Sequence, residues 1–107
     1  MPEATTPRME QLQKLLAREP NDPFLIYGLA LEWKKAGNPK QAIELLDRVI
    51  AIDPSYCYAY FQQGQIHESA GNIEAAKAIY RKGIDAARQK GDNHALSELQ
   101  AALMDIE

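Results

Sequence analysis

The side chains that most often carry chemistry are few in this chain and stand apart from one another. His67 and His94 are 27 residues apart, and neither has a partner histidine or cysteine at the spacing of a metal site. Cys57 begins a predicted helix, where a thiolate would be stabilised, but the sequence places no histidine beside it. The acidic residues form no pair with the spacing of an acid–base couple. We therefore predict no enzyme activity, no catalytic residue, no metal site and no cofactor.

Composition and charge exclude further classes of function. A length of 107 residues indicates one domain. The net charge of −3 argues against a nucleic-acid-binding surface, which usually needs a basic excess. The sequence contains no secretory signal and no apolar run near the roughly 18 residues of a membrane span. Because the single cysteine cannot form an internal disulfide, we expect a cytoplasmic protein, with neither nucleic acid nor membrane as a partner.

Basic residues cluster near one predicted helix in the second half of the chain. A solvated helix face is the simpler explanation for them, and a weak site for an acidic partner is the alternative. The residues are Lys77, Arg81, Lys82, Arg88 and Lys90.

A 34-residue repeat organises the chain and positions these side chains. Gly37 returns as Gly71, and Ala42 returns as Ala76. A constant period of this length is typical of stacked helix pairs. The two alanines are expected where the helices of a repeat cross closely, because a larger side chain would push the helices apart.

Capping residues, prolines and apolar spacing predict six helices. Asn38 and Pro39, for example, suit the start of a helix, and Asp53 before Pro54 suits its end. Apolar residues recur between them at helical spacing. The helices are expected over residues 6–19, 23–36, 39–52, from 57 onward, 73–90 and 92–106.

The period and the placement of glycine, alanine and proline together resemble the tetratricopeptide repeat (TPR) family. Two complete copies fit without a gap, and incomplete units flank them. The resemblance implies an all-α fold, a right-handed α-solenoid of antiparallel helix pairs, with one domain following a flexible tail. The expected segments are the tail (1–5) and the TPR domain (6–107), which comprises a half-repeat helix (6–19), repeat 1 (23–56), repeat 2 (57–90) and a capping helix (92–106).

Repeat 2 departs from the family pattern at three positions. Gln63 replaces the usual leucine, His67 the usual tyrosine and Arg88 the usual proline. Without that proline, the helix from residue 73 is expected to continue toward Lys90. His67 is expected at the seam between two helices, buried or half-buried. Gly83 costs this helix about 1 kcal/mol of intrinsic helicity, and we expect closer packing against the next helix to compensate.

The family resemblance also implies a binding surface. In TPR proteins the first helix of each repeat lines a concave groove, and apolar side chains grouped on a surface usually mark an interaction site. The alternative is partial burial of these side chains under the N-terminal tail or the last helix. The candidate groove residues are Phe24, Tyr27, Leu31, Lys34, Tyr58, Phe61, Gln62 and Gln65.

Two functions are consistent with this surface. The first is a non-enzymatic interaction module, an adaptor or scaffold that binds an apolar or amphipathic peptide or helix of another protein in the concave groove. The second is a structural module that associates with further copies of itself, through the groove or through an open end of the repeat array. The expected partner is therefore another protein or peptide, or a second copy of this chain.

Overall fold

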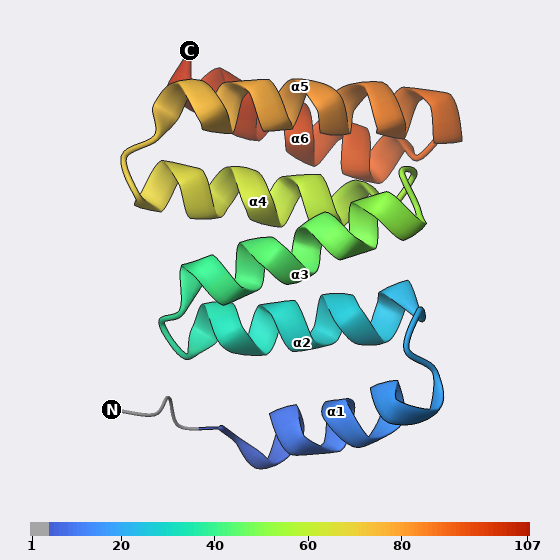
Figure 1. Cartoon of the computed structure of the whole chain (residues 1–107). Helices are drawn as coiled ribbons and strands as arrows, with labels where there is room; N and C mark the ends of the chain where they lie inside the picture. Colours follow the sequence, from blue (N-terminus) through green and yellow to red (C-terminus); the bar gives the residue numbers. More distant parts are fainter. Residues whose placement is uncertain (1–4) are drawn as a thin grey trace. The chain divides into compact units, whose positions relative to one another are not determined.

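The chain folds into helices joined by short turns, as a computed structural model describes for residues 5–107 (Figure 1). Residues 1–4 of the expected flexible tail lie outside the described part; Thr5 donates a hydrogen bond to Glu10. The described residues form no strand and no helix that is long and apolar enough to span a membrane. The helices are α1 (Pro7–Arg18), α2 (Pro23–Lys35), α3 (Pro39–Ile52), α4 (Cys57–Ser69), α5 (Ile73–Lys90) and α6 (Asn93–Ile106).

The helices form two compact units, residues 1–52 with α1 to α3 and residues 53–107 with α4 to α6. In the first unit α2 packs against both α1 and α3, and in the second α5 packs against both α4 and α6. Consecutive helices within each unit run antiparallel (Figure 1). The all-α class and the helix pairing are thereby confirmed, whereas the expected single domain over residues 6–107 stays a prediction.

Side-chain oxygens cap α1, α2, α3 and α6 where the sequence predicts helix starts, whereas α4 and α5 have no side-chain cap. Thr6 before α1 and Asn38 before α3 each accept a hydrogen bond of 3.1 Å from the backbone N–H three residues on. Asp22 before α2 accepts one of 2.9 Å, and Asp92 before α6 accepts one of 3.0 Å. These bonds satisfy N–H groups that a helix leaves unpaired in its first turn, so they confirm the predicted starts.

Glycines end the helices that are followed by tight turns. Gly37 after α2 and Gly71 after α4 both have φ of 81°, and Gly91 after α5 has φ of 76°. Residues with a side chain rarely adopt this left-handed conformation, which explains glycine at each position. Helix α5 extends to Lys90, as the loss of the family's proline led us to expect.

The core of the first unit is built from apolar residues that recur at helical spacing. Leu45 and Leu46 of α3 are both buried in it. Leu15 is 44% exposed, because only α2 covers α1 within this unit. The buried side chains are Met9, Leu12, Ile26, Leu29, Ala30, Trp33, Ala42, Leu45, Leu46 and Val49.

The core of the second unit depends on close approach to α5. A Cβ atom on Gly83 would lie 2.8 Å from Cβ of Tyr60 and 2.9 Å from a methyl group of Leu99. This confirms the predicted close packing of Gly83 against the next helix, α6, and adds a contact with α4. Gln63 is buried, and no buried side-chain nitrogen or oxygen within residues 5–107 lacks a hydrogen-bond partner. The family's leucine is therefore replaced here by a satisfied polar group.

Candidate interaction surfaces

Cys57 and the two histidines do not form a catalytic or metal-binding arrangement. The thiol of Cys57 is buried and donates a hydrogen bond of 3.3 Å to the carbonyl of Ser55, and burial raises its pKa. His67 is half-buried, and His94 is exposed with Nε2 lying 2.7 Å from a carboxylate oxygen of Glu98. Within residues 5–107, no three histidine, cysteine, aspartate or glutamate side chains are grouped to hold a metal ion. The candidate site residues that remain to be described are those of the predicted groove.

The candidate residues of the first unit all lie on α2, and we call them the α2 face: Phe24, Tyr27, Leu31 and Lys34. Their spacing of three and four places them in one stripe along the helix. Phe24 is 71% exposed, and the other three side chains are half-buried. Burial lowers the pKa of Lys34. The α2 face thus presents one projecting aromatic ring beside side chains that are held against the unit.

The candidate residues of the second unit all lie on α4, and we call them the α4 face: Tyr58, Phe61, Gln62 and Gln65. All four are half-buried. The rings of Tyr58 and Phe61 meet edge to face with centroids 6.3 Å apart. Both rings also pack against the buried core of their own unit, so each contributes to stability as well as to the surface. The side chains of the α4 face are therefore partly buried against their own unit and partly exposed to solvent.

A hollow of about 390 Å³ adjoins the α4 face, and we call it the acidic hollow. Helix α4 contributes Phe61, Gln65 and Glu68, α5 contributes the ring of Tyr80, and α6 contributes Glu98, Asp105 and two alanines. The hydroxyl of Tyr80 donates a hydrogen bond to the carboxylate of Glu68. Burial, that hydrogen bond and nearby negative charge raise the pKa of Tyr80.

The two acidic residues of α6 are functional candidates that the sequence analysis missed. Glu98 and Asp105 are seven residues apart, so they share one face of a helix. That spacing is visible in the sequence, but α6 was interpreted only as a cap. What the spacing does not reveal is that this face of α6 lies opposite Phe61 and Gln65.

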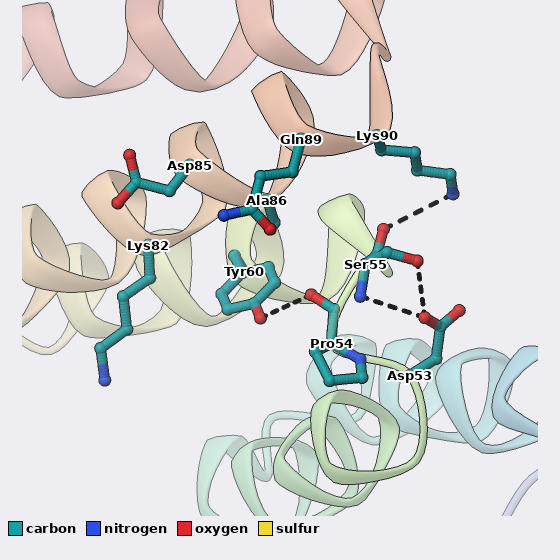
Figure 2. Close-up of a pocket in the computed structure, with 9 residues that line it drawn as sticks. All are labelled: Asp53, Pro54, Ser55, Tyr60, Lys82, Asp85, Ala86, Gln89 and Lys90. Atoms are coloured by element: carbon teal, nitrogen blue, oxygen red, sulfur yellow. Dashed lines mark hydrogen bonds between the residues drawn. The ribbon is translucent and has the colours of Figure 1, made fainter.

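Several residues that line a second hollow of the same unit are hydrogen-bonded to one another (Figure 2). The hydroxyl of Tyr60 donates to the carbonyl of Pro54 at 2.7 Å, and the amino group of Lys90 donates to the carbonyl of Ser55 at 3.5 Å. Ser55 donates from its backbone and its hydroxyl to Asp53, at 3.0 and 2.6 Å, which lowers the pKa of Asp53. These bonds tie the segment before α4 to α4 and α5, so we assign the hollow a structural role.

The basic residues of α5 fit a solvated helix face. Lys77 lies 3.3 Å from Glu74 on the same helix, and Arg81 lies 3.1 Å from Glu107. Lys77 is half-buried, whereas both partners of the Arg81–Glu107 pair are exposed, and exposed pairs stabilise a protein only slightly. The alternative, a weak site for an acidic partner, stays a prediction.

Comparisons with known proteins give a consistent picture. The family model described as tetratricopeptide repeat matches residues 34–103. A TPR repeat-containing protein of Pseudomonas aeruginosa is 28% identical over 99 residues, which cover 92% of this chain and 94% of that protein. The solution structure of a tetratricopeptide repeat domain protein from Salinibacter ruber is 36% identical, with a TM-score of 0.78, and the match covers 82% of this chain and 89% of that one. A protein of Bordetella parapertussis is similar in fold, with a TM-score of 0.82 at 24% identity, over 95% of this chain and 89% of that one.

Proposed function

This chain belongs to the tetratricopeptide repeat family, whose repeats generally mediate protein–protein interaction, and we propose that it binds an apolar or amphipathic segment of another protein through the α2 and α4 faces. The family is generally non-catalytic, and we extend that property to this chain. Binding of a peptide or helix requires only a complementary surface, which the first helix of each repeat supplies in our proposal.

The exposure of Phe24 is the observation that carries this proposal. A phenylalanine that is 71% exposed leaves apolar surface in water, and burying that surface against a partner would be favourable. Tyr27 and Leu31 extend the apolar surface along the same stripe of α2. Aromatic anchors with such neighbours often carry most of the binding energy of an interface.

An affinity capture from the native cell tests the proposal. The full chain, a Phe24→Ala/Tyr27→Ala variant and a Lys82→Ala/Arg88→Ala variant would each be immobilised and exposed to the same extract. The last variant is the matched control, because it removes two exposed side chains of α5 that lie outside the α2 and α4 faces. We expect a protein that the parent and the control retain and that the α2 variant loses. Equal retention by all three folded chains would refute the proposal.

Self-association is the second candidate, and the exposure of Met104 favours it. Met104 on α6 is 74% exposed and, with Ile84 and Leu103, lines a hollow between α5 and α6. Exposed apolar surface of this kind can be covered by a further copy of the chain. Size-exclusion chromatography with light scattering over a dilution series distinguishes the two. A dimer that persists on dilution and dissociates in Met104→Glu would support this candidate, and a monomer at every concentration would exclude it.

A cytoplasmic location is part of the proposal. The free, buried thiol of Cys57 supports it, because reducing compartments preserve free thiols. Cell fractionation with detection of the native chain would test it, and recovery in an extracellular or periplasmic fraction would contradict it.

A further inference from the structure

We propose that the acidic hollow receives a basic side chain, preferably arginine, from the segment that the α4 face binds. The inference rests on the proposed function and specifies one chemical feature of the partner. Phe61 and Gln65 belong both to the α4 face and to the hollow, so a segment lying on that face passes the mouth of the hollow.

The lining of the hollow combines negative charge with an aromatic floor. Glu68 from α4 and two carboxylates from α6 line the hollow together with the rings of Phe61 and Tyr80. The centroids of these two rings are 6.3 Å apart. No lysine, arginine or histidine is among the residues that line it within the described part of the chain. The charge of the hollow is therefore not balanced by its own lining, and a cationic group would be complementary to it.

Tyrosines lie beside two of these carboxylates. Tyr80 donates a hydrogen bond to Glu68, and burial together with the nearby charge of Glu98 raises the pKa of Tyr58. Glu98 also lies 2.7 Å from Nε2 of His94. The negative charge of Asp105 contributes, after burial and Glu68, to the raised pKa of Tyr80, so the carboxylate of Asp105 lies near the same hollow.

The arrangement suits an organic cation better than a metal ion. The carboxylates are distributed around the hollow, and no three acidic, histidine or cysteine side chains of residues 5–107 are grouped to ligate a metal. A basic side chain has an aliphatic stem that can pack on Phe61 and the two alanines while its charged end reaches the carboxylates. Arginine fits separated acceptors best, because its guanidinium group presents five N–H donors in different directions.

Three matched peptides test the inference on the full chain. Each is a short amphipathic helix with a leucine face, and the three differ at one flanking position, which carries arginine, its neutral isostere citrulline or glutamate. Dissociation constants would be measured by fluorescence anisotropy at low salt, and the bound position would be mapped from backbone amide shifts of Phe61, Gln65, Glu98 and Asp105.

We expect the arginine peptide to bind about three- to tenfold more tightly than the citrulline peptide, and the glutamate peptide to bind most weakly. The ratio of the dissociation constants of the citrulline and arginine peptides should fall toward one in Glu98→Gln/Asp105→Asn. It should persist in Glu44→Gln/Glu74→Gln, which removes the same charge at exposed positions outside the hollow.

The comparison of arginine with citrulline uses the unaltered chain, so a misfolded variant cannot obscure it. Equal affinities of these two peptides, with shifts at Phe61 and Gln65, would overturn the inference while supporting binding at the α4 face. Absence of binding by all three peptides would overturn the inference together with its premise.

Discussion

The ring of Tyr80 in α5 occupies the space beside Gly64 of α4 in which any other side chain would stand. A Cβ atom on Gly64 would lie 2.1 Å from Cε1 of that ring. The same ring forms part of the acidic hollow, and its hydroxyl donates to Glu68. The packing of α4 against α5 and the chemistry of the hollow therefore depend on the same glycine–tyrosine contact.

Gly64→Ala should destabilise the protein by about 1–3 kcal/mol, even though alanine favours helix formation over glycine. The reason is that the new methyl group overlaps a ring that is completely buried. Chemical denaturation monitored by circular dichroism would measure the change. Gly28→Ala is the control, because its methyl group would meet Leu12 at an ordinary 3.5 Å, and it should be neutral or stabilising by up to about 1 kcal/mol. A Gly64→Ala variant as stable as the parent would contradict the contact.

Gly83→Ala should also destabilise the protein by about 1–3 kcal/mol, because its methyl group would meet Tyr60 and Leu99 at less than normal contact distance. Leu99→Ala alone should cost about 2–5 kcal/mol by leaving a cavity. In the double variant the new methyl group and the cavity compensate in part. The double-mutant cycle should therefore show a loss smaller than the sum by about 0.5 kcal/mol or more, and strict additivity would argue against the contact between Gly83 and Leu99.

Asn38→Ala should cost about 0.5–2 kcal/mol, whereas Asn72→Ala should cost clearly less. The two asparagines occupy equivalent positions of the repeat, but only Asn38 caps its helix with a side-chain hydrogen bond, of 3.1 Å. Thermal and urea melts of the two variants would give the comparison directly. Equal losses would show that the difference in capping has no energetic consequence.

Tyr80→Phe should cost about 1.5–3 kcal/mol at neutral pH, because it removes a hydrogen bond to the charged Glu68. It should also reduce the loss of stability in alkali. Burial raises the pKa of Tyr80 in the folded chain above the value of about 10 that it has in the unfolded chain. The stability that the buried, neutral hydroxyl contributes is therefore fully present below about pH 10 and is lost as the pH rises through the raised pKa. Urea unfolding at neutral pH and above pH 10 should show that the parent loses more stability than Tyr80→Phe, and parallel losses would contradict this assignment.

The helices could be predicted from the sequence because their ends are set by local features. The side chains of Thr6, Asp22 and Asn38 cap their own helices, and Gly37 and Gly71 terminate theirs, so each boundary needs only a few neighbouring residues. The repeat period then identifies which helices form pairs.

The acidic hollow could not be predicted in the same way. Glu98 and Asp105 come near Phe61 only because α6 packs beside α4 and α5, and that packing depends on Gly83 and Leu99. The sequence also could not predict how exposed the aromatic side chains of the α2 and α4 faces are. The pattern placed Tyr58 at the position equivalent to Phe24, yet Phe24 projects into solvent, whereas Tyr58 and its neighbour Phe61 pack on their own core.

This difference determines which substitutions test the α2 and α4 faces most clearly. Tyr27→Ala with Phe61→Ala removes one ring from each face, but the loss of Phe61 also weakens the second unit. Phe24→Ala with Tyr27→Ala removes two side chains of the α2 face, one of them largely exposed. The second pair is therefore preferred for a binding measurement, and the first pair serves as a comparison.

The most direct test of interaction through these faces is a titration of the purified native partner against the parent chain and the Phe24→Ala/Tyr27→Ala variant. Circular dichroism melts would first establish that the variant is folded. We predict that the variant binds about 30-fold more weakly, which corresponds to about 2 kcal/mol, and that added salt has only a modest effect on the parent. A folded variant that binds the partner as tightly as the parent would contradict this account.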